Sequence, residues 1–249
     1  MSASKQEKAM DVTSHLSELR NRLMVTAIVF VIFFIIGFVY RKEIYAFFEK
    51  DIHIKLNIMS PLETVWIFFS IAGLVAIVAT IPLLTLQLWL FIKPGLEKEE
   101  RRATLSYIPA IFFLFILGLV AGYLAFTYLI FPFLIALNDG LFNEMFTVEK
   151  YFRILFHTMI VFAFVFELPI VMMFLTSLGI LTPDFLKRTR KYAYFILLLV
   201  SGLITPPDII LQIVVGIPLI LLYEISVQLA SYAHRKKIKR QQANLQSYN

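Results

Sequence analysis

The chain alternates between long apolar blocks and short connections that are charged or rich in proline. Six apolar segments are evident, at about residues 23–39, 65–92, 105–131, 154–181, 192–204 and 209–230. An α-helix needs about 20 apolar residues to span a bilayer, and several of these segments approach or exceed that length. The pattern predicts an all-α integral membrane protein with six transmembrane helices. We expect one polytopic domain over residues 1–249, with the six-helix bundle at 23–230.

The fifth and sixth segments are expected to form shortened helices. At ~1.5 Å per residue, residues 192–204 give only about 20 Å of apolar helix, whereas a hydrocarbon core is ~30 Å thick. The pair would therefore thin the bilayer locally or leave a water-accessible notch. Prolines within the other segments predict kinks, and with them a concave bundle. These prolines are Pro82, Pro109, Pro169 and Pro218.

Gly118 and Gly122 are a pair of small residues in the third segment. Two small residues at this spacing let another helix backbone approach closely. We therefore expect a tight helix contact on that face of the segment.

Composition supports the assignment to a membrane. Apolar residues make up 59% of the chain and the mean hydropathy is +0.80, against about 45–50% apolar residues in soluble domains. Cysteine is absent, which excludes disulfides and thiolate chemistry. The four histidines are scattered without metal-ligand spacing, so neither a metal nor a cofactor is expected.

Lysine and arginine are unevenly divided between the two sides that six spans would define. Seventeen of the 23 lie in residues 1–22, 93–104, 182–191 and the tail after Tyr232. The positive-inside rule then places both termini in the cytoplasm, as an amphipathic N-terminus (1–22) and a basic tail (231–249). The net charge of +6 could suggest a nucleic-acid partner. The cluster His234–Arg240 is better interpreted as an anchor to membrane lipid headgroups, so no nucleic acid is expected.

Two cytoplasmic acids stand out by their spacing. Glu18 lies on an amphipathic stretch and can pair with Arg22 one helical turn later. In the charged connection 93–102, Glu100 has no basic residue three or four positions further along. It could therefore accept a guanidinium from elsewhere. On spacing alone, an interfacial helix and a solvated charged turn explain both segments.

Glu167 interrupts the apolar segment 154–181 near its middle, and Pro169 follows two positions later. A charged acid at the bilayer centre costs on the order of 2.5–3.5 kcal/mol on insertion scales. A proton-relay acid in a transporter is one interpretation. A protonated carboxyl bonded to a neighbouring helix backbone is another.

Asp208 precedes the sixth apolar segment and is expected to cap its helix. Gln212 lies one turn further along on the same helical face. Both would lie at the shallow end of the shortened helix pair.

Five motifs follow one another along these segments: HLSELRNRL (His15–Leu23), SPLETVWIFF (Ser60–Phe69), QLWLFIKPGLEKEERR (Gln87–Arg102), FELPIV (Phe166–Val171) and TPPDIILQ (Thr205–Gln212). Together they closely resemble the TatC family, the multi-spanning subunit of the twin-arginine protein translocase. The resemblance covers about residues 11–230. It implies a core receptor in the bacterial cytoplasmic membrane, not an enzyme.

The resemblance also implies roles for individual residues. Glu18 and Glu100 match the acids that bind paired-arginine signal peptides of folded cargo. Arginine binds carboxylates through a planar fork that lysine cannot copy. Glu167 and Pro169 would form a polar contact for a partner's transmembrane helix or the inserted signal. Asp208 and Gln212 match polar positions of the functional surface.

The family's partners are the single-span TatA and TatB proteins, and its energy source is the proton motive force. Several copies of the chain are expected in the complex. The alternative function is a proton-coupled secondary transporter with Glu167 as its coupling acid, but other intramembrane ionisable groups are scarce. An intramembrane protease would need a serine, HExxH or paired-aspartate motif, and the sequence has none.

Overall fold

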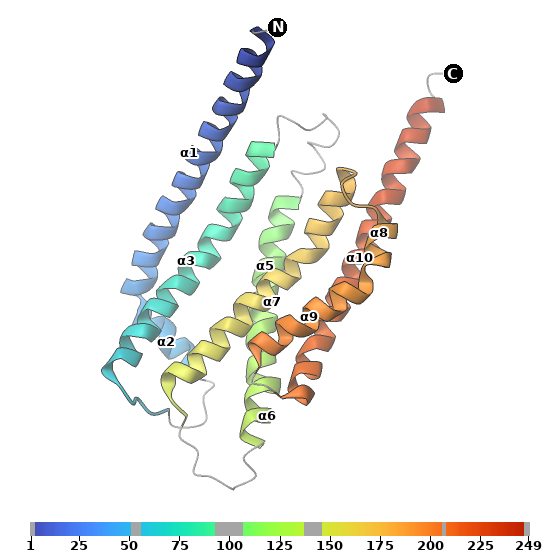
Figure 1. Cartoon of the computed structure of the whole chain (residues 1–249). Coiled ribbons are helices and arrows are strands. Elements are labelled where there is room, and N and C mark those ends of the chain that lie inside the picture. Colours follow the sequence, from blue (N-terminus) through green and yellow to red (C-terminus); the bar gives the residue numbers. More distant parts are fainter. Residues whose placement is uncertain (1–2, 51–55, 93–106, 137–145, 206–207, 247–249) are drawn as a thin grey trace. The chain divides into compact units, whose positions relative to one another are not determined.

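The computed structural model describes residues 3–50, 56–92, 107–136, 146–205 and 208–246 (Figure 1). Within these ranges the chain is helical apart from short connections and one isolated bridge between Asn57 and Thr147. Five helices are long and apolar enough to cross a membrane: Ser17–Val39, Pro61–Phe91, Pro109–Ala136, Val148–Ser177 and Ile209–Arg235. The all-α membrane architecture is therefore confirmed.

The chain divides into two compact units. The first comprises Met1–Ile52 and Val65–Ile108, and the second comprises His53–Thr64 and Pro109–Asn249. The single polytopic domain stays a prediction.

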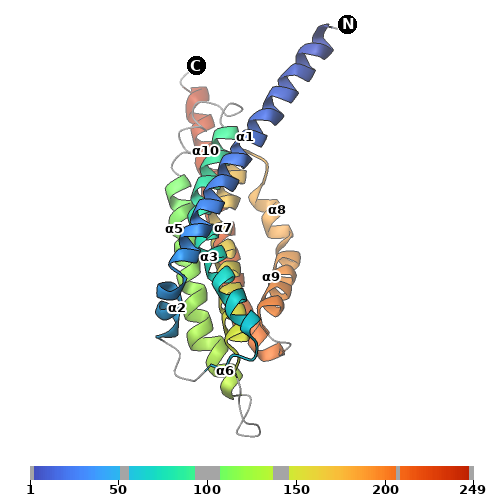
Figure 2. The same ribbon diagram turned by 90° about the vertical axis from the view of Figure 1, so that its left-hand side faces the viewer.

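The first unit consists of α1 (Ala3–Val39), α2 (Arg41–Glu49) and most of α3 (Pro61–Ile92). Helices α1 and α3 lie side by side in opposite directions, as both views show (Figures 1 and 2). At one end the guanidinium of Arg22 reaches Gln87. At the other end the ring of Phe38 meets the ring of Phe69, with centroids 5.4 Å apart.

The second unit contains the remaining helices. These are α5 (Tyr107–Ala125), the π-helical turn η2 (Phe126–Ile130), α6 (Phe131–Ala136), α7 (Val148–Ser177), α8 (Pro183–Arg188), α9 (Arg190–Ile204) and α10 (Ile209–Gln246). Helix α7 packs along α10, and α9 forms a hairpin with α10 (Figure 1). The core is apolar, with the largest fully buried side chains including Phe115, Phe152 and Leu219.

The two glycines of α5 make the expected close helix contact. A Cβ added at Gly118 would lie 2.6 Å from the Cα of Ala163, and one at Gly122 would lie 2.7 Å from the Cα of Met159. Both neighbours are backbone atoms of α7, which cannot move aside without shifting the helix. The prediction from the small-residue spacing is confirmed.

Helix α9 is short, as expected, but α10 is not. The 15 residues of α9 extend about 22 Å at ~1.5 Å per residue, and whether it crosses the membrane stays a prediction. Helix α10 has 38 residues, so the expectation of a shortened sixth helix is wrong. The apolar pattern ends near residue 230, but the Lys, Arg, Gln and Ala residues that follow are good helix formers and prolong the helix.

Three of the four prolines lie inside helices, where each removes one backbone hydrogen bond. They are Pro82 in α3, Pro169 in α7 and Pro218 in α10. Pro109 instead lies in the first turn of α5. Because the N–H groups of a first turn have no helical acceptor, Pro109 costs no bond and needs no kink.

Candidate functional site

The carboxylate of Glu18 on α1 forms an ion pair with Arg22, one turn further along the helix. The Glu18 side chain is 42% exposed and that of Arg22 is 20% exposed. The pair expected from the spacing is therefore present. It leaves a substantial part of the acid accessible.

Arg22 also connects α1 to α3. Its Nη1 atom lies 3.3 Å from the backbone oxygen of Gln87 and 3.5 Å from the Oε1 atom of that side chain. Thr26 lies one turn further along α1 and is buried. Its hydroxyl donates a hydrogen bond to the backbone carbonyl of Arg22. Arg22 is thus anchored to both α1 and α3, and from this position its guanidinium orients the carboxylate of Glu18. Sequence spacing could show the ion pair but not the contact with Gln87.

Glu100, the second predicted recognition acid, lies outside the described residues, as do Lys93–Arg102 around it. Its assignment stays a prediction.

Glu167 lies on α7, and both of its carboxylate oxygens are buried. Neither oxygen has a hydrogen-bond partner in the part of the chain that the structure describes. An unsatisfied buried carboxyl costs free energy, so Glu167 in this arrangement does not stabilise the chain. The backbone-bonded interpretation of Glu167 gains no support from this geometry.

Pro169 is buried two residues beyond Glu167. Because proline has no N–H, the carbonyl of Val165 lacks its usual helical donor. Two kinds of acceptor, the Glu167 carboxylate and this carbonyl, thus lie within one turn of α7. Together they form a polar spot within an apolar stretch of α7.

Asp208 caps α10 as expected. Its Oδ1 atom accepts from the N–H of Leu211 at 2.8 Å, and its carbonyl accepts from the N–H of Gln212 at 3.0 Å. The cap satisfies a backbone donor at the start of the helix. Asp208 therefore has a structural role that accounts for its position.

Gln212 connects the two helices of the α9–α10 hairpin. Its Nε2 atom donates to the carbonyl oxygen of Leu198 at 2.8 Å. Gly202 makes room for this side chain, since a Cβ there would lie 2.8 Å from the Nε2 atom. The structure brings Asp208 and Gln212 together at this end of the hairpin, with both side chains partly exposed.

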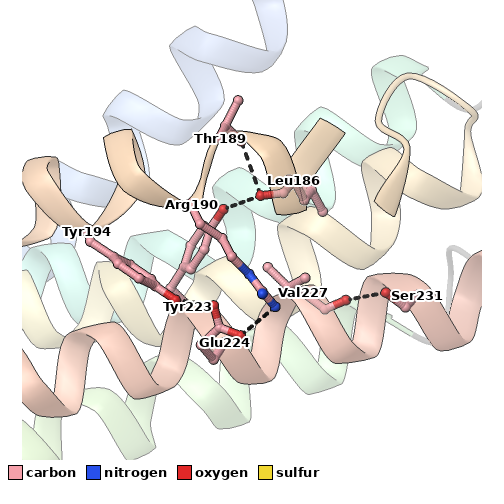
Figure 3. A network of polar contacts seen from close by, with 8 residues as sticks. All are labelled: Leu186, Thr189, Arg190, Tyr194, Tyr223, Glu224, Val227 and Ser231. Carbon is pink, nitrogen blue, oxygen red and sulfur yellow. Dashed lines mark hydrogen bonds and ion pairs between the residues drawn. The ribbon is translucent and has the colours of Figure 1, made fainter. Parts of the chain in front are cut away.

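A polar network on α9 and α10 was not predicted from the sequence (Figure 3). Glu224 on α10 accepts from Arg190 at 2.8 Å and from the hydroxyl of Tyr194 at 2.5 Å. The hydroxyl of the preceding residue, Tyr223, donates to the carbonyl of Leu186 at 2.9 Å. Glu224 and Arg190 are 34 positions apart, so only the folded hairpin reveals the pair.

An apolar cavity of about 650 Å³ also lies in the second unit. Its walls come from α5, η2, α7 and α10, and include Phe166, which precedes Glu167, and Pro218 inside α10. The π-helical turn contributes Tyr128 and Leu129 to one wall. No local sequence signal marks this cavity. Among the described side chains, no three histidines or acids converge on a possible metal site.

Comparison with known proteins identifies the family. The family model described as "Sec-independent protein translocase protein (TatC)" matches residues 14–218. The chain is 42% identical to TatCd of Bacillus subtilis over 95% of this chain and 98% of the relative. It is 34% identical to TatC of Aquifex aeolicus over 94% of this chain and all of the relative.

The fold matches a solved structure as well. It resembles the crystal structure of the twin-arginine translocase receptor TatC with a TM-score of 0.75 at 30% identity. The match covers 88% of this chain and 99% of that chain. Sequence and fold thus agree over most of the length, and the chain belongs to the TatC family of Sec-independent protein translocase proteins.

Proposed function

We propose that this translocase subunit is the receptor for signal peptides that carry paired arginines. The peptide would bind at the cytoplasmic face through Glu18 and Glu100. Both termini would be cytoplasmic and α9 would form the fifth of six crossings, in agreement with the excess of Lys and Arg in residues 1–22, 93–104, 182–191 and the tail after Tyr232.

The accessible, positioned carboxylate of Glu18 is the observation that supports this proposal. Arg22 holds the acid at a defined place, because the same guanidinium contacts Gln87 on the neighbouring helix. A carboxylate has two oxygens and about four lone-pair sites, so it can accept a further guanidinium beside Arg22. Fixing the acid in advance lowers the entropy cost of binding a flexible peptide.

A second part of the proposal concerns the membrane. Glu167 and the turn that Pro169 opens would bond a polar group on the transmembrane helix of TatA, of TatB or of an inserted signal. Its unsatisfied oxygens support this, since a partner could supply the missing donor. Asp208 and Gln212 would form a further polar surface used in translocation. Several copies would assemble in the complex, and the proton motive force would drive transport.

The transporter alternative is not favoured, because the relatives are named as protein translocase components. These names describe a transport role and no catalysis.

Peptide binding to the purified protein in lipid nanodiscs tests the receptor. We expect Glu18→Ala and Glu100→Ala each to weaken binding of a fluorescent paired-arginine peptide by roughly 10-fold or more, since bonds to charged groups contribute ~1.5–3 kcal/mol. Replacing both peptide arginines by lysine should weaken binding to the parent protein similarly. Unchanged affinity in both acid variants would sink the proposal.

Glu149→Ala is the matched control. Glu149 pairs with Arg153 one turn later on α7, as Glu18 does with Arg22 on α1. In the proposed topology the first turn of α7, where Glu149 lies, would be on the opposite side of the membrane. We expect its loss to leave peptide affinity unchanged, and an equal loss would indicate a general charge effect.

A further inference from the structure

The elbow between α8 and α9 carries three cations that pair with no carboxylate of the described residues. Lys187 and Arg188 end α8, and Lys191 lies in the first turn of α9, all with exposed side chains. Across the described ranges, none of these three side chains forms an ion pair. Their neighbour Arg190 differs, because Glu224 binds it. The acid nearest in sequence, Asp184 in the first turn of α8, leaves the elbow net positive.

The elbow is held in place from α10. Tyr223 donates to the carbonyl of Leu186, and Arg190 pairs with Glu224 (Figure 3). Within the elbow, both the N–H and the hydroxyl of Thr189 donate to the carbonyl of Phe185, at 3.0 and 2.9 Å. These bonds fix the backbone on both sides of the three cations. When an anion binds, only the side chains of Lys187, Arg188 and Lys191 must therefore become ordered, because the backbone that carries them is already held.

Two aromatic side chains lie among the cations and are largely exposed. Phe185 is 54% exposed and Tyr192 is 60% exposed. The ammonium of Lys191 lies 5.0 Å from the centre of the Tyr192 ring. Aromatic side chains next to cations are typical of the boundary between hydrocarbon and headgroups.

The exposed face of α9 continues from Tyr192 as an apolar stripe. Its members follow helical spacing and are Phe195, Ile196, Leu199 and Leu203. A stripe of this kind is compatible with hydrocarbon and not with water. The cations lie where the stripe ends, so they would reach the depth of the lipid phosphates if α9 crosses the membrane.

We propose that the α8–α9 elbow binds the headgroup of an anionic phospholipid, with phosphate held by Lys187, Arg188 and Lys191. Phe185 and Tyr192 lie beside the first carbons of the acyl chains. Charge-assisted bonds from these cations suit phosphate oxygens. An acidic protein segment would match the charge but would leave the exposed rings and the apolar stripe without a function. The proposal does not depend on the proposed role of Glu18 and Glu100 in peptide binding.

Native mass spectrometry of the full-length protein in detergent tests the site. Phosphatidylglycerol and phosphatidylcholine are titrated separately against the parent and against K187Q/R188Q/K191Q. Each cation near a charged membrane contributes a factor of about five, so we expect the triple variant to bind phosphatidylglycerol ~10- to 100-fold more weakly. Phosphatidylcholine binding should not change. K187R/K191R, which keeps the charge, should bind like the parent.

The matched control is K42Q/K50Q/K150Q, which removes three exposed lysines from other parts of the chain. Equal loss of phosphatidylglycerol in both triple variants would overturn the proposal, because it would show a general charge effect. Tight binding of soluble glycerophosphoglycerol, equal to that of the lipid, would also overturn it in favour of a free-phosphate site. If the triple variant does not fold, as shown by loss of the parent's thermal transition, the three single variants are tested instead. Each should bind phosphatidylglycerol about fivefold more weakly than the parent.

Discussion

Arg190 and Glu224 form an ion pair of 2.8 Å between the start of α9 and the middle of α10. The same carboxylate accepts from Tyr194, so both of its oxygens are used. The pair therefore joins the two helices of the hairpin at the end opposite to Gln212.

The first prediction concerns this pair. We expect Glu224→Ala to destabilise the protein by about 1–2 kcal/mol, because two bonds to a charged group are lost at a partly exposed site. Arg190→Ala should cost less, since Tyr194 still bonds Glu224. Thermal unfolding in detergent measures both.

A double-mutant cycle with R190A/E224A gives the coupling between the two side chains. If the losses of unfolding free energy in the two single variants simply add in the double variant, the pairing is contradicted. A double variant that is about as stable as Glu224→Ala alone would support it.

The second prediction concerns the contact of α5 with α7. We expect Gly118→Ala to destabilise the protein by ~1–3 kcal/mol, because the new methyl group overlaps the backbone at Ala163. Gly73→Ala is the control, since a Cβ at Gly73 meets nothing within 4 Å. Alanine is favoured over glycine inside a helix, so Gly73→Ala should be neutral or stabilising in the same unfolding assay. Equal behaviour of the two variants would contradict the close contact.

The third prediction separates the two polar residues at the start of α10. Asp208→Asn keeps a capping oxygen and should retain stability, whereas Asp208→Ala should cost about 1 kcal/mol. Gly202→Ala should displace Gln212 from Leu198 and resemble Gln212→Ala in both stability and cargo export. If Asp208→Asn is stable but exports poorly, the residue has a role beyond capping. Normal export by Asp208→Ala and Gln212→Ala would remove both from the functional surface.

The fourth prediction concerns Glu167. We expect Glu167→Leu to be at least as stable as the parent, because it removes two unsatisfied buried oxygens, yet to export folded cargo poorly. Glu167→Gln, which keeps a polar group, should retain more export. The two measurements are thermal unfolding and export in cells that depend on the variant.

One result would contradict the interpretation of Glu167 as a contact for a partner helix. If Glu167→Ala abolishes transport but leaves signal binding and crosslinks to TatA and TatB intact, the residue is not a partner contact. A proton-relay role would then explain the defect better.

Much of the structure could be predicted from local sequence patterns. The apolar segments located all five long helices, because a membrane span is recognised by the composition of one continuous stretch. The cap at Asp208, the pair of Glu18 with Arg22 and the close approach at Gly118 were also predictable, since each follows from helical spacing. The length of α10 was not predictable, because the apolar pattern shows where a membrane span ends and does not show that the helix continues beyond it.

By itself the sequence determined the helical membrane architecture, the family and the identity of the candidate acids, because these depend on composition and on motifs a few residues long. The tertiary structure decided which groups meet. Arg22 with Gln87, Arg190 with Glu224 and Gln212 with Leu198 join residues from different helices. Helix packing brings such groups within hydrogen-bond distance, and no periodicity within one helix encodes which residue of another helix it will meet.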